Sequence, residues 1–215
     1  MKELFVVIGL GRFGRSVAER LVELGEDVVG IDNNEETIKE LVDTLPSVFV
    51  ADCTDEKALK EIGVQDAKTV VVSVGSNVET SVLSVAILHG FGIKEIYAKA
   101  VNTLHGRVLA KVGATRVIFP EKEKGIDLAN HLAGLDIIEA LDSTGRYVFA
   151  KIKSPQKFSG KSIIQLDVRK RFGLTIIGIE RAGKMDINPS PNEIILKDDY
   201  LLVVGKKEDI EKVRG

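Results

Sequence analysis

The sequence contains no tryptophan, one cysteine and three histidines among its 215 residues. The lone cysteine, Cys53, excludes an intrachain disulfide and a cysteine-rich metal site. No apolar run approaches the roughly 18 residues of a membrane helix, and the opening residues MKELFVV predict a strand and no signal peptide. The net charge of -2 gives no excess of positive charge that would attract nucleic acid or an anionic membrane. We therefore expect a cytoplasmic protein that does not bind nucleic acid.

Residues 1–120 alternate short apolar runs with amphipathic helical patterns. Strands are predicted at residues 4–10, 27–32, 47–52, 69–74, 95–100 and 115–120. Nearly continuous apolar strands between helices are typical of a parallel sheet that is covered on both faces. The first part of the chain is thus predicted to be an α/β domain with a Rossmann-like, doubly wound parallel sheet of about six strands.

The pattern changes after Pro120. Residues 121–134 predict a connecting helix, and residues 135–215 predict a small α+β C-terminal lobe. In this lobe two strands flank a Ser-Thr-Gly turn, a short helical stretch follows, and further strands precede a final helix. We expect a first domain at 1–120, the connecting helix, and the second lobe.

Residues 5–16, FVVIGLGRFGRS, lead from the first strand into the first helix with the spacing G-x-G-x-x-G. Gly9 permits a tight turn, Gly11 lets the backbone approach a phosphate, and Gly14 lets the helix pack closely. The helix N-terminus offers N–H groups and partial positive charge to an anion. Asp32 ends the second strand, where a carboxylate accepts hydrogen bonds from ribose hydroxyls and repels the 2′-phosphate of NADP. These residues predict an adenine-nucleotide site.

Three nearby positions have more than one interpretation. Arg12 lies inside the turn and either reaches a terminal phosphate, of its own or a neighbouring subunit, or is solvated. Asp52 ends the third strand and lies at the adenine edge, caps the following helix, or does both. Cys53 is expected to be a small core or pocket residue, because no second cysteine exists to support a redox role.

Functions of three classes are compatible with this site. A ligand-gated regulatory subunit needs no catalytic group. An NAD-dependent oxidoreductase needs a proton donor or acceptor near the nicotinamide, but all three histidines precede residue 135. A redox-sensing transcription factor needs a basic recognition helix, and the basic segment at 168–173 is too short. The sequence favours a regulatory subunit that is not an enzyme, with the oxidoreductase as the alternative.

Longer segments resemble a known family. VIGLGRFGRSVAERL, ADCTD, VVVSVGSNVETSVL and AKAVNTLHGRVLAKVGATRVIFPEKEKG resemble the N-terminal domain of RCK (KTN, TrkA-N) proteins, and the chain from FSGKSIIQLDVRKRFG onward is similar to their TrkA-C lobe. GLGRFG together with VIFPEK resembles the KtrA type. The resemblance implies a gating-ring subunit of a Ktr- or Trk-type potassium channel or transporter, peripheral to the inner face of the membrane. It also implies homodimers that form a homo-octameric ring on a KtrB/TrkH-like membrane subunit.

In this family ATP or ADP, and sometimes NAD, binds the first domain, with ATP favouring the conducting state. The residues that the resemblance assigns to the pocket are Gly9, Gly11, Arg12, Phe13, Gly14, Asp32, Asn33, Asn34, Asp52, Cys53, Val74, Gly75, Ser76, Lys99, Ala100, Val101, His105 and Glu121. Glu121 matches the family's ligand to a divalent cation, Mg²⁺ or Ca²⁺, beside the phosphates of paired subunits; otherwise it stabilises a helix N-terminus after Pro120. Lys99 neutralises phosphate or is a rim charge, and His105 is expected at the pocket edge.

The second lobe of the family can bind cyclic di-AMP at a dimer interface. The matching positions are Ile163, Ile164, Arg169, Leu174, Thr175 and Pro191. An arginine beside an apolar floor can pair with a phosphate while the bases stack on aliphatic side chains. The alternative interpretation is an ordinary hydrophobic dimer seam with a surface arginine.

Overall fold

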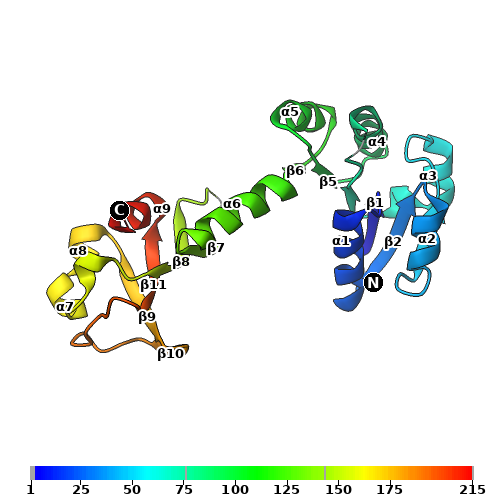
Figure 1. Ribbon diagram of the computed structural model, residues 1–215. Coiled ribbons are helices and arrows are strands. Elements are labelled where there is room, and N and C mark those ends of the chain that lie inside the picture. Colours follow the sequence, from blue (N-terminus) through cyan, green and yellow to red (C-terminus); the bar gives the residue numbers. More distant parts are fainter. Residues whose placement is uncertain (1–2, 76, 143, 215) are drawn as a thin grey trace. The chain divides into compact units, whose positions relative to one another are not determined.

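The computed structural model describes residues 3–75, 77–142 and 144–214 and divides the chain into two compact units, Met1–Glu121 and Lys122–Gly215. Figure 1 shows both units, and each is described here by itself. Along the described residues, no helix combines the length and the apolar character that crossing a membrane requires.

The first unit contains a six-stranded parallel sheet with the order β3-β2-β1-β4-β5-β6. Its strands are β1 (Leu4–Ile8), β2 (Asp27–Asp32), β3 (Ser47–Val50), β4 (Thr69–Val72), β5 (Glu95–Lys99) and β6 (Arg116–Ile118). Its helices are α1 (Arg12–Glu23), α2 (Glu35–Leu41), α3 (Glu56–Ile62), a 3₁₀ turn η1 (Val64–Asp66), α4 (Val78–Gly90) and α5 (Thr103–Val112), and α6 (Pro120–Leu132) begins in it. The predicted doubly wound sheet is confirmed.

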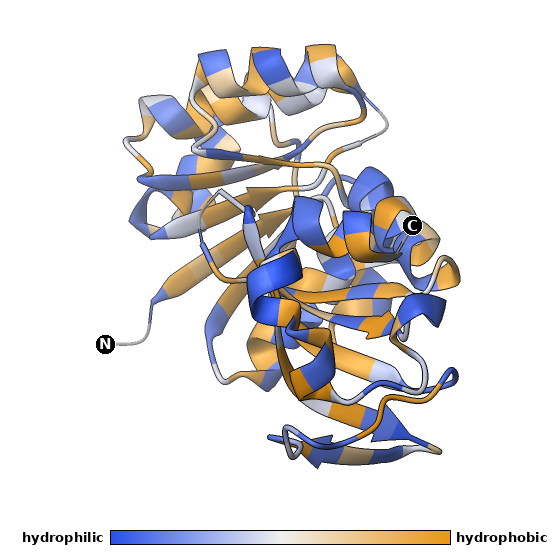
Figure 2. Cartoon of the chain, turned by 90° about the vertical axis from the view of Figure 1, so that its left-hand side faces the viewer, coloured by the Kyte–Doolittle hydropathy of each residue, from blue (hydrophilic) through white to orange (hydrophobic). Residues whose placement is uncertain are grey.

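Alternate residues of the central strands face opposite sides of this sheet. Val6 and Ile8 of β1 pack in a core that includes Leu59 of α3 and Leu88 of α4. Val7 packs in a second core with the apolar faces of α1 and α2. The helices carry both hydrophilic and hydrophobic residues, as amphipathic helices do (Figure 2). Helices therefore cover both faces of the sheet.

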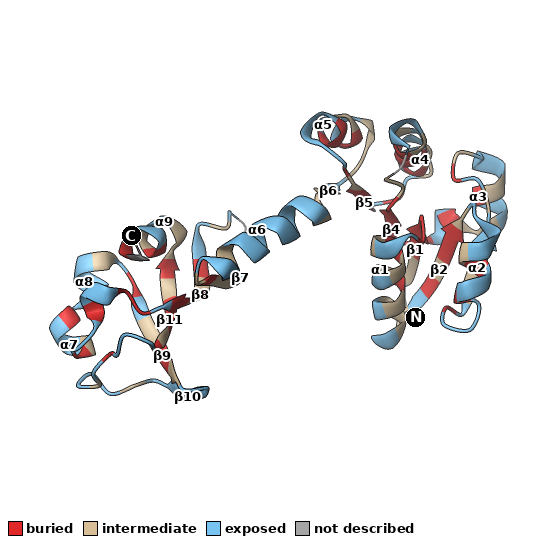
Figure 3. Cartoon of the chain, in the orientation of Figure 1, coloured by how far each residue is buried: buried red, intermediate tan, exposed pale blue. Residues whose placement is uncertain are grey.

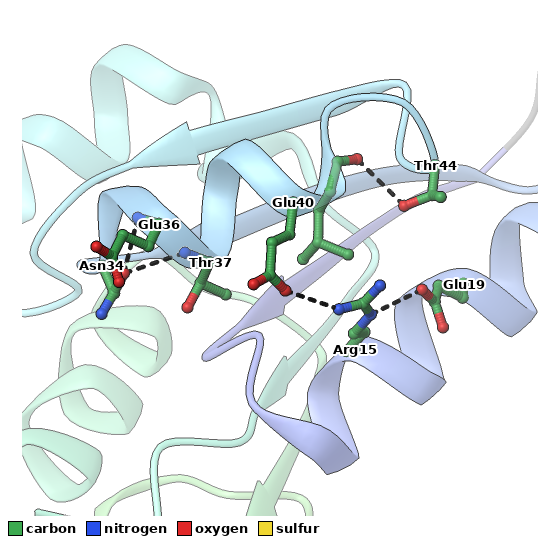
Figure 4. Close-up of polar contacts among 8 residues, drawn as sticks. Arg15, Glu19, Asn34, Glu36, Thr37, Glu40 and Thr44 are labelled. Carbon is green, nitrogen blue, oxygen red and sulfur yellow. Dashed lines mark hydrogen bonds and ion pairs between the residues drawn. The ribbon is translucent and has the colours of Figure 1, made fainter.

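Side chains at the helix ends fix where each helix begins. The Asn34 side chain accepts hydrogen bonds from the N–H groups of Glu36 and Thr37, so α2 begins after it (Figure 4). Asn34 is therefore the N-cap of α2. Arg15 of α1 contacts Glu19 in its own helix and Glu40 of α2, as Figure 4 shows. Both pairs are partly exposed and contribute little to stability.

The second unit contains a five-stranded antiparallel sheet with the order β10-β9-β11-β8-β7. Its strands are β7 (Leu135–Ala140), β8 (Tyr147–Lys153), β9 (Thr175–Arg181), β10 (Lys184–Ile187) and β11 (Tyr200–Lys206). A 3₁₀ turn η2 (Gln156–Phe158) and the helices α7 (Ile163–Leu166), α8 (Val168–Phe172) and α9 (Lys207–Arg214) complete it. The predicted α+β lobe is confirmed.

The short helical stretch predicted near residue 165 is two helices. Asp167 between them has φ of 43°, in the left-handed region that aspartate tolerates better than most residues. Buried residues lie on the strands and on the helix faces and loops that pack against them, whereas α6 is exposed along most of its length (Figure 3). Among the described residues of α6, none is buried.

Candidate nucleotide site

A cavity of about 760 Å³ opens at the carboxyl ends of β1, β2, β4 and β5. It spans the point between β1 and β4 where the strand order reverses, which is where doubly wound sheets bind ligands. Its volume is within the range of small-molecule and cofactor sites. The residues that line it are Ile8, Gly9, Gly11, Ile31, Asp32, Asn33, Ala51, Cys53, Ser73, Val74, Gly75, Asn77, Thr80, Lys99, Val101 and Glu121.

The three glycines of the first turn have different structural roles. Gly9 has φ of +86°, and a Cβ at this position would lie 3.0 Å from the Ser73 carbonyl carbon. A Cβ on Gly14 would lie 1.9 Å from the Gly9 oxygen, so α1 packs on the turn only with glycine here. A Cβ on Gly11 would meet no atom within 4 Å. Gly11 is therefore the position at which the backbone leaves room for a ligand.

The Asp32 carboxylate is bonded to two backbone N–H groups. Its Oδ2 accepts from Leu10 at 2.7 Å, and its Oδ1 accepts from Asn34 at 2.9 Å. These bonds tie the end of β2 to the glycine turn and fix the carboxylate at the cavity wall. Because each carboxylate oxygen has a second lone pair, Asp32 can still accept bonds from ribose hydroxyls.

Lys99 and Glu121 form an ion pair at the cavity. The Lys99 ammonium nitrogen lies 2.6 Å from Oε1 of Glu121, and it also lies 5.9 Å from the centre of the Phe13 ring. The lysine holds the pKa of the Glu121 carboxyl below its usual value, with smaller contributions that include the charge of Arg12. Arg12 begins α1, is exposed and does not line the cavity. Positive charge therefore borders the cavity on the side of the glycine turn.

Asp52 lies outside the cavity lining. It accepts hydrogen bonds from the N–H and the hydroxyl of Thr54, which lower the pKa of its carboxyl. The interpretation of Asp52 as a helix cap is wrong, because the N-cap of α3 is Asp55. A turn separates the end of β3 from the first residue of α3, and the Asp52 side chain stabilises that turn.

Cys53 lines the cavity and is buried. Burial is the main cause that raises the pKa of its thiol. The Ser84 hydroxyl donates a hydrogen bond to the Cys53 backbone oxygen at 3.1 Å, which holds α4 against this loop. A thiol that stays protonated is a poor nucleophile, so Cys53 forms part of the wall.

His105 is buried below the cavity rim and does not line it. Its Nδ1 accepts a hydrogen bond from the Val101 N–H at 3.3 Å, and its Nε2 has no partner among the described residues. Burial lowers the pKa of the imidazole. His105 therefore lies behind the lining and contacts it through the backbone N–H of Val101, and its role at the pocket edge stays a prediction.

Ten of the predicted pocket residues line the cavity: Gly9, Gly11, Asp32, Asn33, Cys53, Val74, Gly75, Lys99, Val101 and Glu121. Seven do not, and they are Arg12, Phe13, Gly14, Asn34, Asp52, Ala100 and His105. Ser76 lies outside the described residues. Sequence reasoning missed the apolar lining residues Ile8, Ile31 and Ala51 and the polar ones Ser73, Asn77 and Thr80. The place of the three polar residues after β4 and at the start of α4 was a usable signal.

The metal prediction for Glu121 has limited support in the protein's own side chains. Along the described parts of the chain, no three His, Cys, Asp or Glu residues gather as metal ligands. Glu121 is the second residue of α6, directly after Pro120, so its carboxylate also stabilises the N-terminus of that helix. A cation at Glu121 would need oxygen ligands from another molecule, such as nucleotide phosphates.

In the second unit, the positions predicted for cyclic di-AMP differ in how far they are buried. Ile163 and Ile164 begin α7, and the Ile164 N–H donates to the Pro191 oxygen at 2.8 Å. Ile164, Arg169, Thr175 and Pro191 are exposed. Leu174 is 1% exposed and packs in the core of this unit, so its side chain is not available to a ligand.

Known proteins resemble this chain over nearly its whole length. The TrkA-N domain family matches residues 5–120, and the TrkA-C domain family matches residues 147–215. The Ktr system potassium uptake proteins A and C of Bacillus subtilis (strain 168) are 35% and 32% identical to the chain. These matches cover 97% and 99% of the chain, and 94% and 96% of the relatives. A solved structure described as the GsuK channel bound to NAD matches all of this chain and 40% of its own, with a TM-score of 0.65 at 20% identity.

The channel structure supports the fold alone, because its sequence identity is low. The two family matches and the relatives with more than 30% identity confirm the predicted resemblance. The chain belongs to the RCK family, in which a TrkA-N domain is joined to a TrkA-C domain.

Proposed function

We propose that the chain is a nucleotide-binding regulatory subunit of a Ktr- or Trk-type potassium uptake system, with no enzymatic activity. The observation that carries the proposal is the cavity at the glycine turn, with Asp32 and Lys99 in its wall, in a chain of RCK architecture. The relatives are named as Ktr potassium uptake proteins, so the partner is a KtrB/TrkH-like membrane subunit. The first domain at 1–120, the helix at 121–134 and the lobe at 135–215 are the parts of this subunit.

ATP or ADP is the proposed ligand, and NAD is the third candidate. Asp32 would accept the ribose hydroxyls, and the open backbone at Gly11 would receive a phosphate. Lys99 would neutralise phosphate charge from the cavity wall. Among the residues that line the cavity there is no histidine, and its cysteine is buried with a raised pKa. The cavity thus offers groups that bind a nucleotide, and its remaining acid–base side chains, Asp32, Lys99 and Glu121, are held in hydrogen bonds or in an ion pair.

Discrimination between ATP and ADP would come from Arg12. Its side chain is exposed at the start of α1, where it can reach a terminal phosphate of its own or a neighbouring subunit. Inverting a two-state population from 1:99 to 99:1 takes about 5.5 kcal/mol. Shared over eight proposed subunits, this is about 0.7 kcal/mol per site, which one charge-assisted hydrogen bond can supply.

Homodimers in an octameric ring are the proposed assembly. Ile126, Leu128 and Leu132 of α6 are 47%, 59% and 78% exposed. A helix with three such side chains and no described buried residue gains from a covering partner. The half-buried Ile163 and the exposed positions Ile164, Arg169, Thr175 and Pro191 remain the proposed site for cyclic di-AMP, without a contribution from the Leu174 side chain.

Titration calorimetry of the purified chain with ATP, ADP and NAD tests the nucleotide proposal. We expect heats of binding for at least one adenine nucleotide, no loss of NADH absorbance with a panel of carbonyl compounds, and an oligomer by light scattering. The absence of heat with all three nucleotides would refute the proposal, and carbonyl-dependent oxidation of NADH would favour the oxidoreductase.

Arg12→Ala tests the discrimination directly. We expect the ratio of ATP to ADP affinity to fall toward one, because the variant lacks the contact to the terminal phosphate. Lys122→Ala, which removes a charge from an exposed position outside the cavity, is the control. A retained ratio in Arg12→Ala would mean that another group reads the terminal phosphate.

A further inference from the structure

Lys99 and Glu121 are predicted to serve two different parts of a ligand, yet they contact each other. Lys99 is expected to bind phosphate, and Glu121 to bind a cation beside that phosphate. In the structure the ammonium of Lys99 lies 2.6 Å from Oε1 of Glu121. The Lys99 side chain is 15% exposed and the Glu121 side chain 71%, so the pair joins the cavity wall to solvent at the start of α6.

The ammonium of Lys99 is confined by its surroundings. The Phe13 ring lies below it on α1, and a Cβ added at Gly75 would lie 3.6 Å from both Cε and Nζ of the lysine. Gly75 and Lys99 both line the cavity. The ammonium therefore lies between the first turn of α1 and the turn after β4, in the wall of the cavity.

The charges around Glu121 oppose a cation while Lys99 remains in place. The charges of both Lys99 and Arg12 act on the Glu121 carboxylate. A divalent ion at Oε1 would lie within a few ångströms of an ammonium, and the described residues gather no group of three His, Cys, Asp or Glu side chains that could hold it.

We propose that Lys99 keeps Glu121 from binding cations until the phosphates of a nucleotide draw the lysine away. This inference rests on the proposed nucleotide function. A polyphosphate carries more negative charge than one carboxylate and is a stronger partner for the ammonium. Glu121 is then free, and the phosphate oxygens beside it supply the further oxygen ligands that Mg²⁺ requires.

Reciprocal coupling between the two ligands is the consequence. Nucleotide raises the affinity for Mg²⁺, and Mg²⁺ raises the affinity for nucleotide by the same factor. Substitution of either member of the pair then has opposite effects on the two ligands. Lys99→Gln frees Glu121 for a cation but removes a phosphate contact, and Glu121→Gln frees Lys99 for phosphate but removes the cation ligand.

Calorimetry on the full chain and its variants tests the proposal in two arms. In the first, MgCl₂ is titrated without nucleotide. We expect Lys99→Gln to bind Mg²⁺ at least about fivefold more tightly than the wild type, and the double variant Lys99→Gln/Glu121→Gln to lose this gain. Lys122→Gln, which removes the charge of an exposed lysine next to Glu121, should match the wild type.

In the second arm ADP is titrated in the presence of a chelator. We expect Glu121→Gln to bind ADP at least as tightly as the wild type, and Lys99→Gln to bind more weakly. If the wild type binds no ADP, the proposed function itself fails. If the wild type binds ADP but Glu121→Gln binds it more weakly, then Glu121 positions Lys99 for phosphate and the inference is overturned. The inference is also overturned if Lys99→Gln gains no affinity for Mg²⁺. Thermal unfolding of each variant shows that the compared proteins are folded.

Discussion

Gly11 and Gly14 belong to the same turn, but a methyl group has different consequences at the two positions. At Gly14 the added Cβ would lie 1.9 Å from a backbone oxygen, which cannot move without separating α1 from β1. At Gly11 the φ is −65° and no atom lies within 4 Å of the added Cβ. Gly14 is needed for folding, and Gly11 is needed for access by a ligand.

We expect Gly14→Ala to destabilise the first unit by about 3 kcal/mol or more, as overpacking against backbone does. Gly11→Ala should stay within about 0.5 kcal/mol of the wild type, yet bind adenine nucleotides about tenfold more weakly or worse, because its methyl group occupies the phosphate position. Urea unfolding and calorimetry measure the two effects. Equal stability of the two variants would contradict this division of roles.

His105 predicts a pH dependence of stability. Its pKa in the folded chain is lowered by burial, whereas the unfolded chain titrates near pH 6.5. The unfolded state therefore binds a proton first as the pH falls. The stability that the neutral imidazole contributes is complete above about pH 6.5 and is lost as the pH falls from there toward the folded pKa.

Protonation of Nδ1 would also break the bond from the Val101 N–H. We expect His105→Asn to reduce the loss of stability between pH 7.5 and 5.5, measured by urea unfolding at constant ionic strength. An unchanged pH profile in this variant would show that other groups govern the acid sensitivity of the first unit.

At the scale of elements, one arginine joins β9 to the segment that precedes β11. Arg181 donates to both carboxylate oxygens of Asp199 at 2.8 Å, to the Ile194 oxygen and to Glu193. Asp199 is 1% exposed, and its Oδ2 also accepts from the Leu196 N–H. Arg181 is the main cause that lowers the pKa of the Asp199 carboxyl.

We expect Arg181→Ala to cost the second unit about 2–3 kcal/mol, because it leaves a buried carboxylate with a single backbone partner. Arg181→Lys should recover only part of this loss, since an ammonium cannot form the bidentate contact. Chemical unfolding followed by hydrogen exchange in β9 and β11 measures both. A wild-type stability for Arg181→Ala would mean that water replaces the guanidinium without cost.

The acid limit of the second unit follows from the same pair. An unfolded aspartate titrates near pH 3.9, and the folded pKa of Asp199 is lower. The contribution of Asp199 to stability is therefore complete above about pH 4 and is lost as the pH falls through the folded value.

At the scale of the whole molecule, each unit has its own core. The cavity lies in the first unit, whose two apolar clusters are separate from the cluster of the second unit. A ligand that binds the folded first unit stabilises it by about 2.7 kcal/mol at a hundredfold excess over the dissociation constant.

We expect saturating ADP to slow hydrogen exchange in β1, α1 and β4, and to leave global protection in β8 and β11 nearly unchanged. Exchange of the intact chain, followed by mass spectrometry with and without ADP, measures this difference. Equal added protection in both units would show that they unfold as one cooperative body.

Local patterns in the sequence determined the elements and the family. Strand and helix periodicity, the glycine spacing and the cap at Asn34 depend on neighbouring residues, so six parallel strands and the turn at Gly9 were predictable. Only the tertiary structure decided which side chains meet at the cavity. Asp32 bonds the glycine turn 22 residues earlier, and Lys99 at the end of β5 meets Glu121 at the start of α6.

The same non-local geometry decided which residues line the cavity. His105 and Phe13 lie outside the lining and contact the lining residues Val101 and Lys99, whereas Asn77 and Thr80 line it from the start of α4. The residue type fixes what a side chain can bind, because binding depends on its chemical groups. The packing of distant strands and helices fixes which partner it finds, because contacts across a parallel sheet join segments that no local pattern relates.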